Sequence, residues 1–264
     1  MDKLLKVAMS TLMVMATVCL IGCNKVDDPN NDDNNGSNGG NSGETPETPA
    51  IVSTSEVQYD GMVYIEAVFE DESKMYFAIL SSSEVAVASG EFYYQDNPSH
   101  AYMYRGEVVI PERITHLGTT YSVVAIAYKA FYRCNLVTSV YIPNSVKFIN
   151  EFLHYGAFAG CVNLVEIKMS ENIQYIGSSA FNGCDALTDI FLPSTITKIE
   201  DGAYTSYDLT NTTTITCMAI EPPILSEHAF VGRNVQVIYV PVSSVDAYKA
   251  ANGWSRYENV IVGI

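Results

Sequence analysis

Apolar residues in this chain repeat with a spacing of 23 residues, and this pattern predicts most of the fold. The segment Ala157–Cys161, with the sequence AFAGC, returns as AFNGC at Ala180–Cys184, and Ala203-Tyr204 opens a weaker copy. An earlier copy opens at Phe131. From Phe131, Phe158 and Phe181, apolar side chains follow at offsets 6, 9, 11, 15 and 18. A period of this length indicates a solenoid, in which each coil buries its apolar face only against its neighbours.

The offsets also indicate the type of coil. Offsets 6, 9 and 11 reproduce the L-x-x-L-x-L pattern of a leucine-rich repeat, which places one short strand in each coil. Four strand-like phrases end in proline, where its missing N–H harms the ladder least; they are Val108–Pro111, Val140–Pro143, Ile190–Pro193 and Ile238–Pro241. We therefore expect an α/β leucine-rich repeat solenoid, rich in β-structure, over residues 107–241.

The copies are not uniform. From Phe131 to Phe158 the spacing is 27 residues, and the extra residues fall around Glu151–Tyr155, which predicts a small loop. The pattern is broken again at Ser206–Thr214 and at Glu221–Pro223.

The residues before the repeats predict a β-structured cap. Side chains in Gly61–Leu80 alternate between apolar and polar around a turn at Asp71–Lys74, which indicates a hairpin, and Glu84–Ala88 alternates again. Because the first coil of a solenoid must be covered, we assign residues 51–106 to an N-terminal β-hairpin cap.

The residues after the repeats predict a short helical cap at 242–264. Ser243 and Asp246 have the spacing of a capping box and predict a helix of about two turns. Gly253 supplies the left-handed residue that helix ends favour. We expect Trp254, the only tryptophan, to cover the last coil.

The N-terminal residues predict export and anchoring rather than folded structure. Residues 1–22 hold two lysines and then an apolar run too short for a membrane span of about 20 residues, as in a secretory signal. The ending Leu20-Ile21-Gly22-Cys23 resembles the lipobox of bacterial lipoproteins, which implies lipidation of Cys23; the alternative is an ordinary signal with an incidental cysteine. Residues 23–50 are almost entirely polar, Gly and Pro, which predicts a flexible tether. Four aspartates near its start resemble a surface-export signal, although a merely soluble linker has the same composition.

Composition limits the partners. Residues 51–264 hold 23 acidic and 11 basic residues, a net charge of −12. Nucleic acids and anionic lipids require clustered Lys and Arg, so we expect neither nucleic acid nor a membrane contact other than the lipid anchor.

Three cysteines, Cys134, Cys161 and Cys184, each follow a repeat aromatic by three residues and should stack in one column. A strand spacing of about 4.8 Å lies within reach of a disulfide. The small side chain required at a turn favours packed thiols instead. Zinc requires four converging ligands, so we expect no metal.

No catalytic motif is present. His100, His116, His154 and His228 are far apart, and we expect them to be solvated loop residues. Glu166 and Asp189 should lie in adjacent coils, but two acids on a flat strand face lack the apolar wall that raises the pKa of one partner. We therefore expect no enzyme and no cofactor.

Strand geometry predicts an outward face that is a candidate for ligand binding. Side chains at offsets 9 and 11 should point into the core, so those at offsets 8 and 10 should point out. The candidate residues are Tyr141, Lys168, Phe191 and Tyr239 in one column and Glu166 and Asp189 in the other. Ordinary packing across an exposed sheet is the alternative. A second candidate is the tyrosine-rich segment Phe92–Tyr104, unless it closes the first coil.

Several phrases resemble BspA-type leucine-rich repeat surface proteins, known as lipoproteins of anaerobic Gram-negative bacteria. They are AFAGCVNL (157–164), IPNSV (142–146), GTTYSV (118–123) and VDAYKAANGW (245–254). Ala127 departs from the family, where glycine is usual. The resemblance implies adhesion and binding of host proteins.

These observations lead to two functional hypotheses. The first is a non-catalytic lipoprotein of the outer membrane, exposed at the cell surface, that binds an extracellular protein or polysaccharide. The alternative is a structural or accessory lipoprotein that docks on an outer-membrane complex of its own cell.

Overall fold

The computed structural model describes residues 46–59, 61–89, 104–150 and 156–264. The predicted signal peptide, Cys23 and most of the predicted tether lie outside these residues, as does the predicted loop at Glu151–Tyr155. The chain divides into two units, Met1–Glu47 and Thr48–Ile264. All strands described below belong to the second unit.

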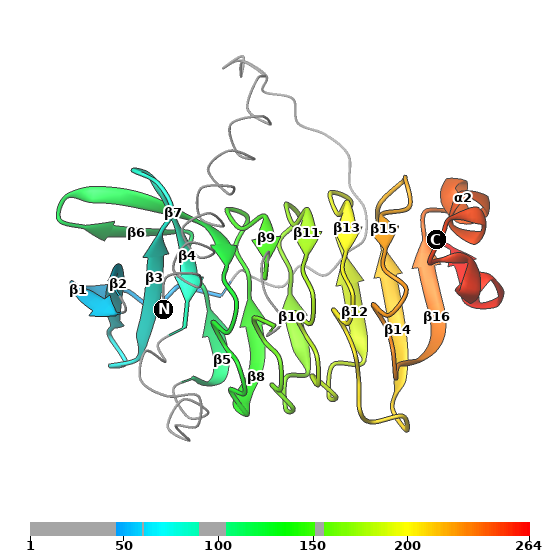
Figure 1. Cartoon of the computed structure of the whole chain (residues 1–264), viewed down its shortest axis with the longest axis horizontal. Helices are drawn as coiled ribbons and strands as arrows, with labels where there is room; N and C mark the ends of the chain where they lie inside the picture. Colours follow the sequence, from blue (N-terminus) through cyan, green and yellow to red (C-terminus); the bar gives the residue numbers. More distant parts are fainter. Residues whose placement is uncertain (1–45, 60, 90–103, 151–155) are drawn as a thin grey trace, which may run out of the picture. The chain divides into compact units, whose positions relative to one another are not determined.

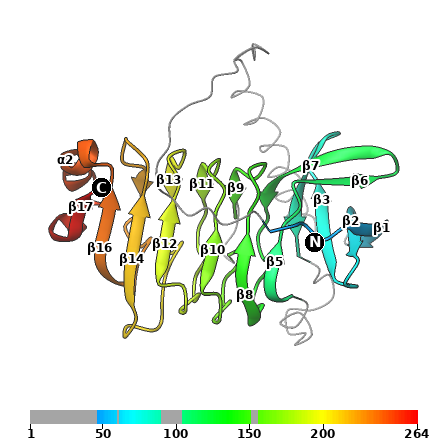
Figure 2. The ribbon, with the colours of Figure 1, turned by 180° about the vertical axis from the view of Figure 1, so that it is seen from behind.

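Two rows of parallel strands follow the repeats (Figures 1 and 2). The long-strand row consists of two sheets: β5 (Arg105–Val109), β8 (Leu136–Tyr141) and β10 (Glu166–Lys168), then β12 (Asp189–Leu192), β14 (Thr212–Cys217), β16 (Asn234–Val240) and β17 (Ile261–Gly263). The short-strand row contains β9 (Phe148–Ile149), β11 (Tyr175–Ile176), β13 (Lys198–Ile199) and β15 (Ile224–Leu225). The prediction of one strand per coil is therefore wrong, because the apolar residues at offset 18 form a second strand.

An antiparallel set of strands precedes the repeats. Its members are β1 (Ile51–Tyr59), β2 (Met62–Phe69), β3 (Lys74–Ile79) and β4 (Glu84–Ala88). Strand β4 pairs in parallel with β7 (Thr119–Ile126), which continues into the short-strand row and also carries the antiparallel β6 (Arg113–His116). The turn between β2 and β3 is fixed by Asp71, whose carboxylate accepts hydrogen bonds from the Ser73 N–H at 3.0 Å and the Ser73 hydroxyl at 2.6 Å.

A column of stacked aromatic rings forms the centre of the core. The ring centroids of Phe131 and Phe158 lie 4.9 Å apart, those of Phe158 and Phe181 5.2 Å, and those of Phe181 and Tyr204 4.9 Å. Phe230 continues the stack. These distances match the spacing between neighbouring strands of about 4.8 Å, because each coil contributes one ring. All five rings are buried, as the repeat predicted.

The turn after each aromatic explains the rest of the repeated phrase. The glycine two residues later adopts a left-handed backbone at Gly160 (φ 78°) and Gly183 (φ 71°), a conformation that costs other residues energy. The cysteine one residue further on is buried. The thiol of Cys161 donates to the carbonyl of Phe131 at 2.9 Å, and that of Cys184 donates to Phe158 at 3.2 Å. The column therefore packs as thiols, and burial raises the pKa of Cys184 well above its usual value.

The C-terminal residues cover the end of the stack, although not as the capping-box spacing predicted. Ser243 lies inside a 3-10 turn, η2 (Val242–Ser244), and the six-residue helix α2 (Val245–Ala250) begins after Ser244 without a side-chain cap. The predicted capping role of Ser243 is therefore wrong. Trp254 is buried, its ring lies 6.3 Å from Phe230, and its indole N–H donates to the Pro223 carbonyl at 2.8 Å.

After Trp254 the chain forms a second 3-10 helix, η3 (Ser255–Val260), and then β17. Helix α2 is the α-helix of the described residues, so the fold is β-rich with parallel sheets. Within the described ranges, no helix has the length and apolar character to cross a membrane.

Candidate binding face

The outer face of the long-strand row carries all six predicted contact residues. Along β12, Asp189 is exposed, Ile190 and Leu192 are buried, and Phe191 between them is partly exposed. The same alternation leaves Tyr239 partly exposed on β16. Alternation places successive side chains on opposite sides of a strand. These side chains therefore point away from the aromatic core, and their role in binding stays a prediction.

Strand register shows that the predicted aromatic row is less continuous than its offsets implied. Phe191 lies opposite Thr216 on β14, and Thr216 lies opposite Tyr239. The repeat offsets do not predict Thr216, because the coil that carries it departs from the repeat. The aromatics of these coils are thus two strands apart, about 9.6 Å at the usual strand spacing.

The outer face is also divided between two sheets. Tyr141, Lys168 and Glu166 belong to the β5–β8–β10 sheet, whereas Phe191, Tyr239 and Asp189 belong to the sheet that starts at β12. Ile167 on β10 is only partly buried, although its offset predicted a core position. Strand β10 ends its sheet, which leaves that side chain less covered.

The β5–β8–β10 half of the face is polar. The ammonium group of Lys168 lies 3.9 Å from the Glu107 carboxylate across β8, and both side chains are more than 40% exposed. An exposed pair of this kind contributes about 1 kcal/mol or less to stability. Glu166 is also exposed, opposite Ser139.

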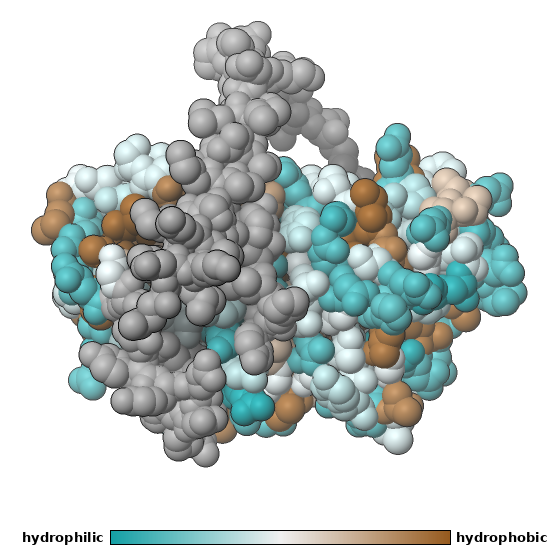
Figure 3. Space-filling view, viewed as in Figure 1, coloured by the Kyte–Doolittle hydropathy of each residue, from teal (hydrophilic) through white to brown (hydrophobic). Residues whose placement is uncertain are grey.

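The β12–β14–β16–β17 half of the face is apolar, and sequence reasoning found only part of it. Its outward apolar side chains are Phe191, Val237, Tyr239, Met218, Val262 and Ile264, and we call this set the apolar face. Met218 follows the irregular strand β14, and Val262 belongs to β17, a strand of three residues. Strand β14 lies two residues later after Tyr204 than the repeat predicts, and β17 lies beyond the last repeat, so the offsets did not identify either strand. In the space-filling view, brown and teal surfaces are interspersed over the C-terminal coils (Figure 3).

Tyr104, the residue of the tyrosine-rich segment that the structure describes, has a structural role. Phe92, Tyr93, Tyr94 and Tyr102 lie outside the described residues. Tyr104 is buried, and its ring lies 4.8 Å from that of Phe131, so it extends the aromatic column at the first coil.

The histidines only partly follow their prediction. His116 lies on β6 and is 5% exposed, so it is not a solvated loop residue. Its Nδ1 lies 3.0 Å from the Thr54 hydroxyl, and its Nε2 lies 3.6 Å from Glu56 on β1. Sequence could not show this contact, because Thr54 is 62 residues away along the chain. His228 is exposed, whereas His100 and His154 lie outside the described ranges.

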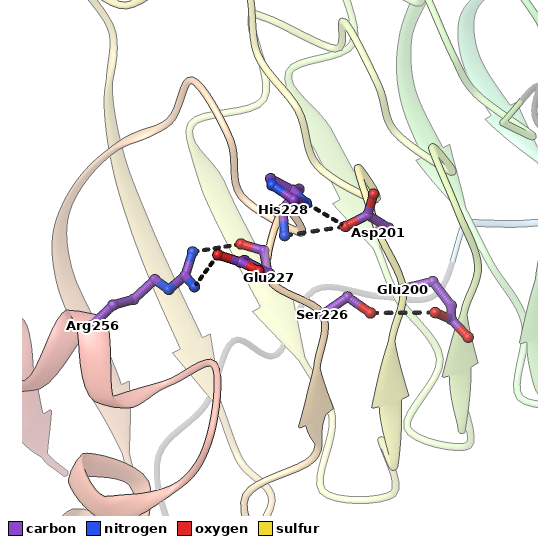
Figure 4. Close-up of polar contacts among 6 residues, drawn as sticks. All are labelled: Glu200, Asp201, Ser226, Glu227, His228 and Arg256. Atoms are coloured by element: carbon purple, nitrogen blue, oxygen red, sulfur yellow. Dashed lines mark hydrogen bonds and ion pairs between the residues drawn. The ribbon is translucent and has the colours of Figure 1, made fainter.

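Polar side chains of the last coils join one coil to the next (Figure 4). Asp201 contacts the His228 ring at 3.0 Å, and Arg256 contacts Glu227 at 3.6 Å. Glu200 accepts hydrogen bonds from Tyr175 at 3.1 Å and Ser226 at 3.3 Å. The side chains in these contacts are exposed to solvent or bond to the turn of a neighbouring coil. Across the described ranges, no group of three or more His, Cys, Asp or Glu is placed to hold a metal ion.

Glu200 also pairs with Lys198, whose ammonium lies 2.5 Å from its carboxylate. Burial alone would raise the pKa of Glu200, but the Lys198 ammonium and the Tyr175 and Ser226 hydroxyls favour the ionised form. The net result is a pKa below the usual value.

The repeats can now be compared with known proteins. The family model for the BspA type leucine rich repeat region matches residues 124–251, in six copies. The repeats belong to the BspA-type leucine-rich repeat family. This BspA-type region contains all six predicted contact residues, while Val262 and Ile264 of the apolar face lie beyond it. A comparison with the curated proteins found no match.

Solved structures of bacterial leucine-rich repeat proteins also resemble this chain. A leucine-rich repeat protein from Bacteroides capillosus is 28% identical, with 54% of this chain and 85% of that chain covered and a TM-score of 0.35. A leucine rich cell surface protein from Faecalibacterium prausnitzii is 21% identical, with 73% and 50% covered and a TM-score of 0.35. The chain thus spans half the length of the Faecalibacterium protein. A leucine rich repeat protein from T. pallidum is 18% identical, with 78% and 95% covered and a TM-score of 0.35.

Proposed function

We propose that this chain is a non-catalytic lipoprotein of the bacterial surface that binds an extracellular protein or glycan. The main support is the outer face of the long-strand row, which carries the partly exposed side chains of Phe191 and Tyr239. The other side of these strands packs into the hydrophobic core. Repeat proteins bind partners on such extended surfaces, and aromatic side chains are favoured anchors of interfaces.

The absence of catalysis is inferred from the surroundings of the acids. Glu166 and Asp189 are exposed on a flat strand face. An acid–base pair of carboxylates requires an environment that separates their pKa values, and solvent on this face supplies none. The matching family is also a repeat family rather than an enzyme family.

The proposed location rests on sequence. The lipobox-like ending at Cys23 would provide the anchor, and the polar segment that follows would act as the tether. The net charge of −12 over residues 51–264 disfavours docking on anionic lipid or nucleic acid.

Binding can be tested with the mature chain made soluble by Cys23→Ser. An array of extracellular-matrix proteins and polysaccharides should yield a ligand. Tyr141→Ala combined with Phe191→Ala should lower the affinity for that ligand about tenfold. The melting temperature should stay nearly unchanged, because both residues face outward. Leu117→Ala, on the exposed tip of the β6–β7 hairpin, is the matched control. A double variant that binds like the parent would show that the outer face is inert.

Location separates the proposed role from the accessory one. Protease added to intact cells should cleave a surface-bound protein. Protection in intact cells, with cleavage after the outer membrane is permeabilised, would instead favour the accessory lipoprotein.

A further inference from the structure

The two halves of the outer face differ in chemistry, and this difference limits what the C-terminal half can bind. On the apolar face, Met218 is 37% exposed, Val262 46% and Ile264 57%. Thr212, Thr214 and Thr216 are the polar side chains of β14, between β12 and β16, on the same side. Met218 and Val262 lie on the two sides of β16, which carries Tyr239, and apolar side chains exposed on one sheet face can mark an interaction surface.

Exposed acidic residues lie on β12 and in the chain segments that adjoin the other strands of this surface. Asp189 lies on β12 itself, Glu221 follows β14, Asp246 follows β16, and Glu258 precedes β17; all four are exposed. Residues 185–264 contain nine acidic and four basic residues.

Most of those basic side chains are already engaged. Lys198 contacts Glu200, Arg256 contacts Glu227, and Arg233 binds backbone carbonyls. The acids beside the apolar face therefore have few local cations to neutralise them.

These features disfavour three of the possible occupants. A second copy of the chain would bring like charges together. An anionic polysaccharide or lipid would meet the same repulsion. A neutral glycan would bury hydroxyl groups against Met218, Val262 and Ile264, which offer no hydrogen bonds in return, and burying unpaired hydroxyls is costly.

We propose that the apolar face docks a protein segment that carries apolar side chains within a basic surface. This inference rests on the proposed binding function and narrows it from protein or glycan to protein. The apolar side chains supply the buried contact, and Asp189, Glu221, Asp246 and Glu258 select the charge of the partner.

The test uses the full mature chain carrying Cys23→Ser and four defined probes. These are a Lys/Leu peptide, a Glu/Leu peptide, a Lys/Ser peptide of equal length, and cellohexaose. Calorimetry should show the Lys/Leu peptide binding at least about tenfold more tightly than each of the others. The combined variant Met218→Ser, Val262→Ser and Ile264→Ser should lose about tenfold in affinity for that peptide, because it removes the apolar contacts.

Leu117→Ser, a substitution of a more exposed apolar residue on the β6–β7 hairpin, should bind like the parent. Unfolding of the triple variant would be visible as a lowered melting temperature, in which case Val262→Ser alone replaces it. Four results would each overturn the inference. Two concern the Lys/Leu peptide: it does not bind, or the Lys/Ser peptide binds equally well. The other two concern the triple variant: its affinity for the Lys/Leu peptide is unchanged, or it loses binding of cellohexaose. A ligand from the array that depends on Tyr141 but not on Val262 would overturn it while leaving the proposed function intact.

Discussion

Phe181 illustrates how a single position in this fold is fixed from both sides. Its ring lies between those of Phe158 and Tyr204, and its backbone N–H donates to the Ala203 carbonyl at 2.7 Å. Phe158 makes the equivalent hydrogen bond to Ala180 at 2.8 Å. The Ala-Phe pair of the repeat is thus explained, since alanine leaves room for the ring of the next coil and supplies the carbonyl.

Phe181→Ala should destabilise the fold by about 3–5 kcal/mol, the usual cost of truncating a buried phenylalanine. Chemical denaturation of the soluble mature chain measures this directly, with Leu117→Ala as the exposed control. An unchanged midpoint would contradict the stacked arrangement.

Glu200 gives a prediction that depends on pH. Its folded pKa lies below the usual 4.5, so its ion pair and hydrogen bonds stabilise the fold above that pH, and this contribution is lost as the pH falls through the folded pKa. Glu200→Gln should therefore lower the melting temperature at about pH 7. The difference from the parent should shrink as the pH falls through the folded pKa of Glu200, because the parent is then protonated as well. A difference that does not vary with pH would show that the charge is not involved.

At the scale of elements, the irregular coil between Tyr204 and Phe230 is stabilised by polar contacts instead of by the repeat. Asp185 accepts hydrogen bonds from the Ser206 hydroxyl and the Tyr207 N–H, both at 2.8 Å. The partly buried guanidinium of Arg233 donates to the carbonyls of Tyr204 and Cys184 at 2.8 and 2.9 Å, and also to Leu187. One side chain thereby joins neighbouring coils.

Arg233→Met should destabilise the chain by about 3 kcal/mol, because buried carbonyls would lose a charged donor. Arg256→Met is the matched control. Its guanidinium is partly exposed and contacts only Glu227 in the described residues, so about 1 kcal/mol or less is expected. Equal losses in the two variants would show that Arg233 is not a special link between coils.

This coil also shows why sequence predicted some elements and not others. Coils with a regular aromatic spacing were recognised because each ring fixes the positions that follow. In the irregular coil, Ile215 pairs with Ile190 but lies at offset 11 from its aromatic instead of 9. The segment Ser206–Asn211 absorbs the two extra residues, so the period is lost although the strand remains. The candidate face was therefore predicted incompletely. Thr216 on β14, Met218 just after β14 and Val262 on β17 belong to it but were not predicted.

At the scale of the whole molecule, the anchor is the feature on which the proposed role depends. Cys23→Ser should move the protein from the membrane fraction to the soluble fraction, because the substitution removes the thiol that the proposed lipid anchor requires. Immunoblots of fractionated cells would measure this, with the neighbouring Asn24→Ser as the control. A Cys23→Ser protein that stays in the membrane fraction would show that another contact holds it there.

The ladder of coil-to-coil hydrogen bonds has a mechanical consequence. The bonds from Phe131 to Ala157 and from Phe158 to Ala180 join successive coils, so a pull from the two ends of the stack would load them one rung at a time. Each 23-residue coil that opened would release about 80 Å of chain. Force–extension traces would show this as regular steps, whereas a single rupture would show that the stack yields as one block. A tethered binder built this way would lengthen under shear and absorb load before its ligand detached.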